Sequence, residues 1–171
     1  MNSAIRAASI ALAAFAAAAG ITMVVGLAAA HAGGDPFYVG KWKITDAKTA
    51  PWVLPTDQLD PSEPKGLIGK TIEIMPGKIA GPGDFPCDKP EYQVLEGGPE
   101  MLFEGSFENM HAQDASLDMQ KLAEQSGFTA AETHFRTIVT GCEYEVDFSF
   151  GADNDTARFA LNDYIYTMKR Q

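Results

Sequence analysis

The chain has 171 residues, of which 46% are hydrophobic and 21% charged, and its formal net charge at pH 7 is −10. This acidity argues against nucleic acids and anionic membrane surfaces as partners, and it leaves basic proteins and cations open. The same charge is also what keeps an exported protein soluble, without any partner.

The first 32 residues have the pattern of an export signal. One positive charge at Arg6 precedes an Ala-rich apolar run over residues 7–30, and residues 30–32 have the small-x-small form that signal peptidase cleaves. The run is long enough to cross a bilayer, so an uncleaved anchor is the alternative. Two glycines interrupt it and no Lys/Arg cluster follows, which favours cleavage. We predict a signal peptide over residues 1–32 and one periplasmic or secreted domain over residues 33–171, without stable membrane insertion after cleavage.

Cys87 and Cys142 are the only two cysteines of the chain. An oxidising compartment favours joining them as a disulfide. The bridge would have a structural role, worth about 4 kcal/mol in the chain-entropy model for a loop of this length.

Apolar residues after residue 32 recur mainly with period two, which is typical of strands with one buried and one solvated face. The predicted strands cover residues 38–45, 67–75, 91–95, 101–103, 135–140, 142–150, 157–161 and 164–170. About eight strands suit a small antiparallel up-and-down barrel. The predicted fold class is therefore mainly β, with one short helix.

Two segments interrupt the strands. Four prolines between residues 50 and 64 exclude a regular strand and predict a long loop, either a binding loop or lid or a plain surface excursion. From Ala115 to Ala123 the apolar spacing is helical, behind a candidate N-cap at Asp114, and Gly127 would end this helix.

Three carboxylates form the most suggestive polar pattern. Glu143, Glu145 and Asp147 would lie on one face of the predicted strand over residues 142–150, roughly 7 Å apart. Such a face either contacts a cationic partner or is simply solvated. Trp52, in the proline-rich loop, either packs against the domain or contacts a ligand.

Motifs for catalysis or metal binding are not found. His111 and His134 lie in no metal-binding pattern, and there is no Gly-x-Ser-x-Gly nucleophile elbow. Residues 153–155 carry alternating Asp and Asn oxygens, but position 157 is alanine where a calcium loop needs a ligand. We predict a protein that is not an enzyme and needs no cofactor or metal.

Gly40, Lys41 and Trp42 in the first predicted strand resemble the Gly-x-Trp signature of lipocalins and the wider calycin group. In that family a basic side chain at the end of the last strand closes the barrel base by packing across the tryptophan. The resemblance assigns this role to Arg170 or Lys169, and makes Trp42 part of the barrel floor. It also implies that the proline-rich loop is a lid and that the barrel has a pocket for a hydrophobic ligand. A disulfide between Cys87 and Cys142 would be a further shared feature, because it would join a loop in the middle of the chain to a late strand.

Two functions follow as alternatives. The first is an exported, non-catalytic protein that binds a small apolar or amphipathic ligand in its barrel. The second is a protein-binding module, such as an inhibitor of a basic cell-wall hydrolase of the lysozyme type, which the acidity would suit. A roomy interior would favour the first, and a filled interior with an exposed loop and an acidic face would favour the second.

Overall fold

The computed structural model of this chain describes residues 36–144 and 146–171, so the predicted signal peptide and Glu145 lie outside the described residues. The described part is mainly β. Its strands are β1 (Gly40–Thr49), β2 (Thr71–Met75), β3 (Lys78–Ala80), β4 (Cys87–Asp88), β5 (Gln93–Gly97), β6 (Phe135–Val139), β7 (Phe148–Phe150), β8 (Thr156–Leu161) and β9 (Tyr164–Arg170). Its helices are α1 (Ser62–Leu67), α2 (Leu102–Gln113) and α3 (Met119–Gln125), with a 3-10 turn η1 (Pro99–Met101).

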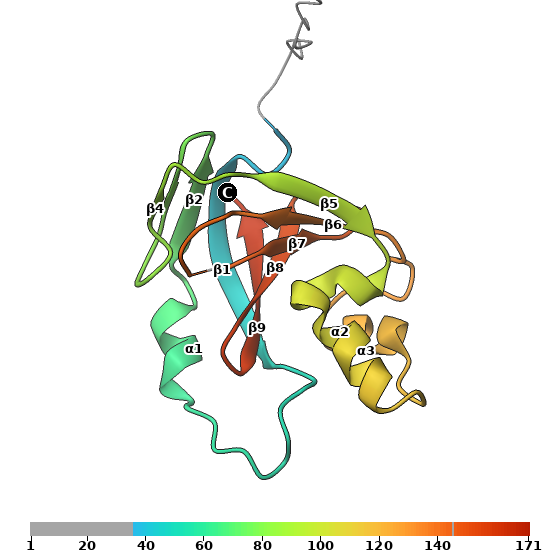
Figure 1. The fold of residues 1–171 in the computed structure, drawn as a ribbon. Coiled ribbons are helices and arrows are strands. Elements are labelled where there is room, and N and C mark those ends of the chain that lie inside the picture. The colour runs from blue at the N-terminus through green and yellow to red at the C-terminus, as the bar shows by residue number, and fades with distance from the viewer. Residues whose placement is uncertain (1–35, 145) are drawn as a thin grey trace, which may run out of the picture. The chain divides into compact units, whose positions relative to one another are not determined.

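The nine strands of the described part form one antiparallel sheet in the order β4-β3-β2-β1-β9-β8-β7-β6-β5. Every paired neighbour is consecutive in the chain except β1 and β9, whose register runs from Trp42 opposite Arg170 to Thr49 opposite Tyr164. This is the order of an up-and-down barrel, and the sheet curls accordingly (Figure 1). The predicted mainly β fold class is confirmed, as a half-barrel, but the described residues form three helices and a 3-10 turn where one short helix was predicted. Because β4 and β5 end the order, no ladder joins them, and we call the gap between them the seam.

The curled sheet encloses a core on its inner side, which we call the concave cluster. Its buried members are Trp42, Ile44, Ile72, Ile74, Ile79, Phe85, Ile138, Phe148, Phe150, Ala157, Phe159, Tyr164, Tyr166 and Met168. They come from β1 and β9, from strands on both sides of this pair and, for Phe85, from the loop between β3 and β4. The central contact is a stacked pair of rings, Phe159 and Tyr166, whose centroids lie 5.0 Å apart with an interplanar angle of 11°. Aromatic side chains thus fill the inside of the half-barrel.

A second core, which we call the helical cluster, lies on the other face of the sheet. Helices α2 and α3 pack there (Figure 1). The residues beneath them alternate with those of the concave cluster, since Ile165 lies between Tyr164 and Tyr166 on β9. Its buried members are Ala50, Leu102, Phe103, Phe107, Leu122, Ala123, Phe128, Phe135 and Ile165. Strand β9 is therefore buried on both faces, and its residues do not alternate between buried and exposed.

The predicted helix is present but shorter than its apolar spacing indicates. Helix α3 begins after Asp118, whose side chain accepts hydrogen bonds from the backbone N–H groups of Gln120 and Lys121 at 2.9 and 3.3 Å. Asp114, the predicted cap, instead binds Ser116 and shapes the turn between α2 and α3. Gly127, with a φ of 101°, follows the helix as predicted.

The prediction of a strand over residues 101–103 was wrong. These residues enter helix α2, and the chain first makes a left-handed turn in which Phe103, Glu104 and Gly105 have φ angles of 51°, 58° and 74°. Leu102 and Phe103 are buried in the helical cluster. Burial of these two large side chains determines the structure here. The sequence does not show it, because three residues are too few to reveal the spacing of apolar residues that distinguishes a strand from a helix.

The proline-rich segment is irregular up to Pro61, as predicted, and continues into α1. Leu67 belongs to that helix, so the strand predicted over residues 67–75 starts only at Thr71. The short strands β3 and β4 were not predicted, because two or three residues carry no detectable alternation.

Candidate functional site

One end of the half-barrel is closed by Trp42 and Arg170. The guanidinium carbon of Arg170 lies 4.2 Å from the centroid of the Trp42 ring, and the indole N–H donates to the carbonyl of Tyr38 at 2.9 Å. Arg170 also donates to the carbonyl of Val39 at 2.8 Å and pairs with Asp155 at 3.2 Å. Trp42 is fully buried, so side chains fill this end of the sheet.

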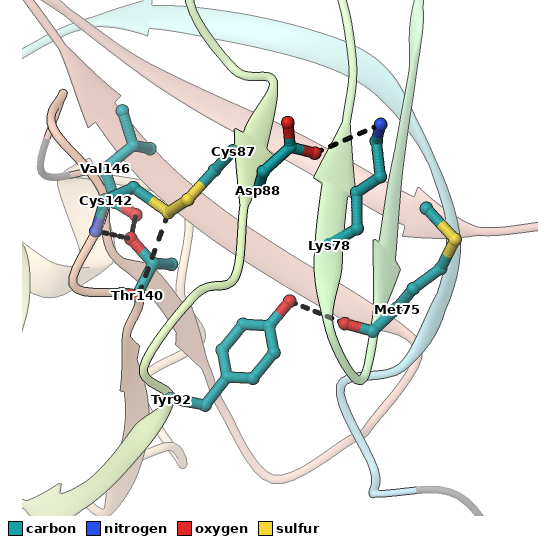
Figure 2. Close-up of a disulfide and its surroundings, with 8 residues drawn as sticks. All are labelled: Met75, Lys78, Cys87, Asp88, Tyr92, Thr140, Cys142 and Val146. Carbon is teal, nitrogen blue, oxygen red and sulfur yellow. Dashed lines mark hydrogen bonds and ion pairs between the residues drawn. A yellow bond between two sulfur atoms is a disulfide. The ribbon is translucent and has the colours of Figure 1, made fainter.

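The seam is crossed by a disulfide, as predicted. Cys87 of β4 is bonded to Cys142, which follows β6, and their Cα atoms lie 6.0 Å apart (Figure 2). A hydrogen bond of 2.8 Å from the hydroxyl of Tyr92 to the carbonyl of Met75 also reaches across, from the segment before β5 to the end of β2. The disulfide and a side-chain hydrogen bond therefore hold the two sides of the seam together, as backbone hydrogen bonds hold neighbouring strands together elsewhere in the sheet.

The segment after β6 corrects the prediction of a long strand over residues 142–150. Gly141 has a φ of 63°, and the Thr140 hydroxyl accepts from the N–H of Cys142 at 3.4 Å and donates to the carbonyl of Val146 at 3.3 Å. These bonds and the disulfide hold the segment away from the sheet, and β7 begins only at Phe148. Tyr144 is 57% exposed.

The predicted acidic face is consequently not a strand face. Glu143 is exposed in a turn and lines a hollow beside the disulfide, together with Lys89. Asp147 lines a different hollow, next to Glu104 and Gly141. The structure does not bring Glu143 and Asp147 together as neighbours along one strand.

The end of the half-barrel opposite Trp42 and Arg170 is open and holds a cleft of about 690 Å³, which we call the rim cleft. Helix α1, the β3–β4 loop, the segment after β6 and the β8–β9 turn converge around it. Its apolar wall is made by Leu67, Phe85, Tyr144, Val146 and Leu161. A volume of this size is in the range that binds small organic molecules.

The rim cleft is shallow rather than a deep cup. Phe85 lies at its floor and packs edge-on against Phe159, with ring centroids 5.2 Å apart. The void behind Phe85, which Ile79 and Phe148 also line, has a volume of only about 10 Å³. That is about the space of one water molecule, so the interior below the cleft is filled.

Glu63 of α1 is the most firmly positioned polar group of the rim cleft. Its two carboxylate oxygens accept from the hydroxyl of Tyr166 at 2.9 Å and from the side-chain amide of Asn162 at 3.0 Å. Tyr164 donates to the carbonyl of Asp60 at 3.1 Å, so β9 and its turn fix both α1 and the segment before it. Burial, and then the hydrogen bond and charge of Glu63, raise the pKa of Tyr166, which therefore stays a donor.

Trp52 both packs and lines a hollow, which we call the side hollow. Its ring lies 6.0 Å from Phe103 and 6.4 Å from Phe107, in the helical cluster. The side hollow measures about 300 Å³ and shares Tyr144, Val146, Leu161 and Asn162 with the rim cleft. Tyr144 thus stands between two adjacent recesses of one surface.

The other candidate groups show no constellation of their own. His111 contacts the carbonyl of Leu117 at 2.7 Å, and His134 lies 3.9 Å from Glu96 at the surface. Across residues 36–144 and 146–171, His, Cys, Asp and Glu side chains form no group of three that could hold a metal ion. In the same residues no helix is long and apolar enough to cross a bilayer.

Sequence reasoning missed Glu63, Phe85, Leu161 and Asn162. An Asn-Asp pair at residues 162–163 is typical of the turn that presents Asn162, but nothing in the sequence ties Glu63 to β9. No protein-family model, curated protein or solved structure matches the chain.

Proposed function

We propose that this protein is an exported, non-catalytic binding protein for a small amphipathic ligand, held in the rim cleft. The observation that carries the proposal is the cleft itself, about 690 Å³ in volume with an apolar wall. Tyr144 supports it most directly, because a large aromatic side chain that is 57% exposed gains by contact with an apolar partner. The lipocalin-like Trp42–Arg170 contact at the opposite end supports it by analogy of fold alone.

A cleft-filling substitution gives a direct test. A side chain at Gly66 would enter open space, since no atom lies within 4 Å of an added Cβ, and Gly66 lines the rim cleft. Gly77 is the matched control, because an added Cβ there also meets nothing within 4 Å and the residue does not line the cleft. We expect saturable, one-to-one binding of the neutral fluorescent probe N-phenylnaphthylamine by the wild type and by Gly77→Phe, and its loss in Gly66→Phe.

Native mass spectrometry of gently purified protein complements this test. A retained mass of a few hundred daltons, absent from Gly66→Phe, would support the proposal and identify the ligand class. Bare protein together with no saturable probe binding would overturn it.

The alternative is a protein-binding module, for example an inhibitor of a basic cell-wall hydrolase. The filled inside of the half-barrel, the net charge of −10 and the exposed Tyr144 between two recesses favour it, whereas the acidic strand face expected with it is not formed. A basic protein that co-purifies with the wild type, and is lost in Tyr144→Ala without loss of stability, would replace the small-ligand proposal.

A further inference from the structure

The charged groups of the rim cleft are all of one sign. Among its described lining residues the ionisable acids and bases are Glu63 on α1 and Asp84 on the β3–β4 loop, with no lysine, arginine or histidine. Lys65, the basic residue of α1, is exposed and does not line the cleft. The two carboxylates belong to different elements that face the same recess, so their charges add within it.

The carboxylate of Glu63 has neutral partners. Tyr166 and Asn162 orient it without cancelling its charge, and both lie on the β8–β9 hairpin below. Burial raises the pKa of the neighbouring Tyr164, and the negative charges of Glu63, Asp60 and Asp163 raise it further, so these carboxylates all lie near this tyrosine. Asp84 is exposed, and within the described residues no hydrogen bond or ion pair reaches its carboxylate.

The apolar wall lies in the same recess as these charges. Phe85 forms the floor of the cleft and Tyr144 has more than half of its surface exposed, so a ligand body would contact rings and aliphatic groups within reach of the carboxylates. An aromatic face and a carboxylate together favour an alkylammonium head group, because the ring attracts cations as well.

We propose that the rim cleft selects amphipathic cations, with the cationic head held at Glu63 and the apolar body on the Phe85 and Tyr144 wall. This inference rests on the proposed function and specifies its ligand class. Charge complementarity chooses the occupant, since an anionic amphiphile would place its head beside two carboxylates with no counter-charge in the cleft.

Three ligands that share the same octyl tail and differ in the charge of the head group test the effect of that charge on binding. Octyltrimethylammonium and octyl sulfate, each below its micelle concentration, and octanol, below its solubility limit, would be titrated against N-phenylnaphthylamine bound to the wild type. We expect octyltrimethylammonium to bind roughly tenfold more tightly than octyl sulfate, with octanol between them, and the difference to shrink at high salt.

Glu63→Gln assigns the effect to one residue. It should weaken binding of octyltrimethylammonium by about fivefold and leave octanol unchanged, because only the cation loses a partner. Glu124→Gln removes the same charge from an exposed position on α3 and should change neither ligand.

The outcomes separate this inference from the proposed function. Equal affinity of all three ligands would overturn charge selection while keeping a binding cleft. Equal weakening of all three by Glu63→Gln would show that Glu63 only positions α1. A lack of any saturable probe binding would overturn the proposed function itself.

Discussion

The disulfide across the seam is predicted to provide a large part of the stability of the domain. Cys87 and Cys142 are separated by 55 positions, and the chain-entropy model gives about 4 kcal/mol for a loop of that length. Replacing both by serine leaves the hydrogen bond from the Tyr92 hydroxyl to Met75 across the seam, which is worth only about 1 kcal/mol. Since domains are stable by roughly 5–15 kcal/mol, the double variant should lose a substantial share of its stability.

Urea unfolding followed by tryptophan fluorescence measures this loss, because the two tryptophans report on different cores. Trp42 is in the concave cluster and Trp52 packs on the helical cluster. The Cys87→Ser/Cys142→Ser variant should unfold with about 4 kcal/mol less free energy and a melting temperature lower by roughly 10 °C. Its m-value should rise, because the uncrosslinked denatured chain exposes more surface.

Two controls make the result interpretable. Wild-type protein under reducing conditions should match the double variant, and Tyr92→Phe, which removes the neighbouring hydrogen bond, should cost about 1 kcal/mol. A double variant within about 1 kcal/mol of the wild type would refute the reasoning, since the crosslink would then not limit the denatured chain as the model requires.

Three further predictions concern other parts of the fold. Arg170→Met should lower the unfolding free energy by about 3 kcal/mol, through loss of charged hydrogen bonds and of the cation–π contact, whereas the exposed neighbour Lys169→Met should change it by less than about 0.5 kcal/mol in the same urea titration. Gly127→Ala should cost about 2 kcal/mol in thermal unfolding, because φ is 101° and the new Cβ would lie 3.1 Å from Arg158 Nε; an unchanged melting temperature would contradict this. Burial, and then the charge of Tyr38, raise the pKa of Tyr92 to about 12 in the folded protein. The protonated Tyr92 hydroxyl therefore adds its full share to the free energy of unfolding below a pH of about 10, the pKa of tyrosine in the unfolded chain, and this share is lost as the pH rises to about 12. Urea midpoints between these pH values should fall less steeply in Tyr92→Phe, and equal slopes would refute the assignment.

The sequence predicts the elements whose signals are local. The bounds of β9 agree with the prediction because a two-residue turn, in which Asn162 adopts a φ of 50°, sets its start. Trp42 lies in a Gly-x-Trp motif, and Arg170 matches the basic residue that accompanies this motif. The chain has only two cysteines, so only one disulfide can form within it. These residues could therefore be placed without knowledge of the sheet.

The sequence does not predict what distant contacts decide. Residues 142–150 alternate like a strand, yet the bond from Cys142 to β4 draws the first part of this run away from the sheet. Glu63 sits in a proline-rich segment that gives no sign of its partner, because its hydrogen bond to Tyr166 joins residues 103 positions apart. Such long-range contacts also assemble the rim cleft, so the sequence alone does not predict it.

The pairing of β1 with β9 has a consequence for how the protein is made. Neither hydrophobic cluster is complete without β9, since Tyr166 belongs to the concave cluster and Ile165 to the helical one. A ribosome releases β1 long before β9 exists, so the nascent chain has few native contacts to gain until synthesis of the domain is finished. The topology itself therefore delays folding until synthesis of the domain is complete.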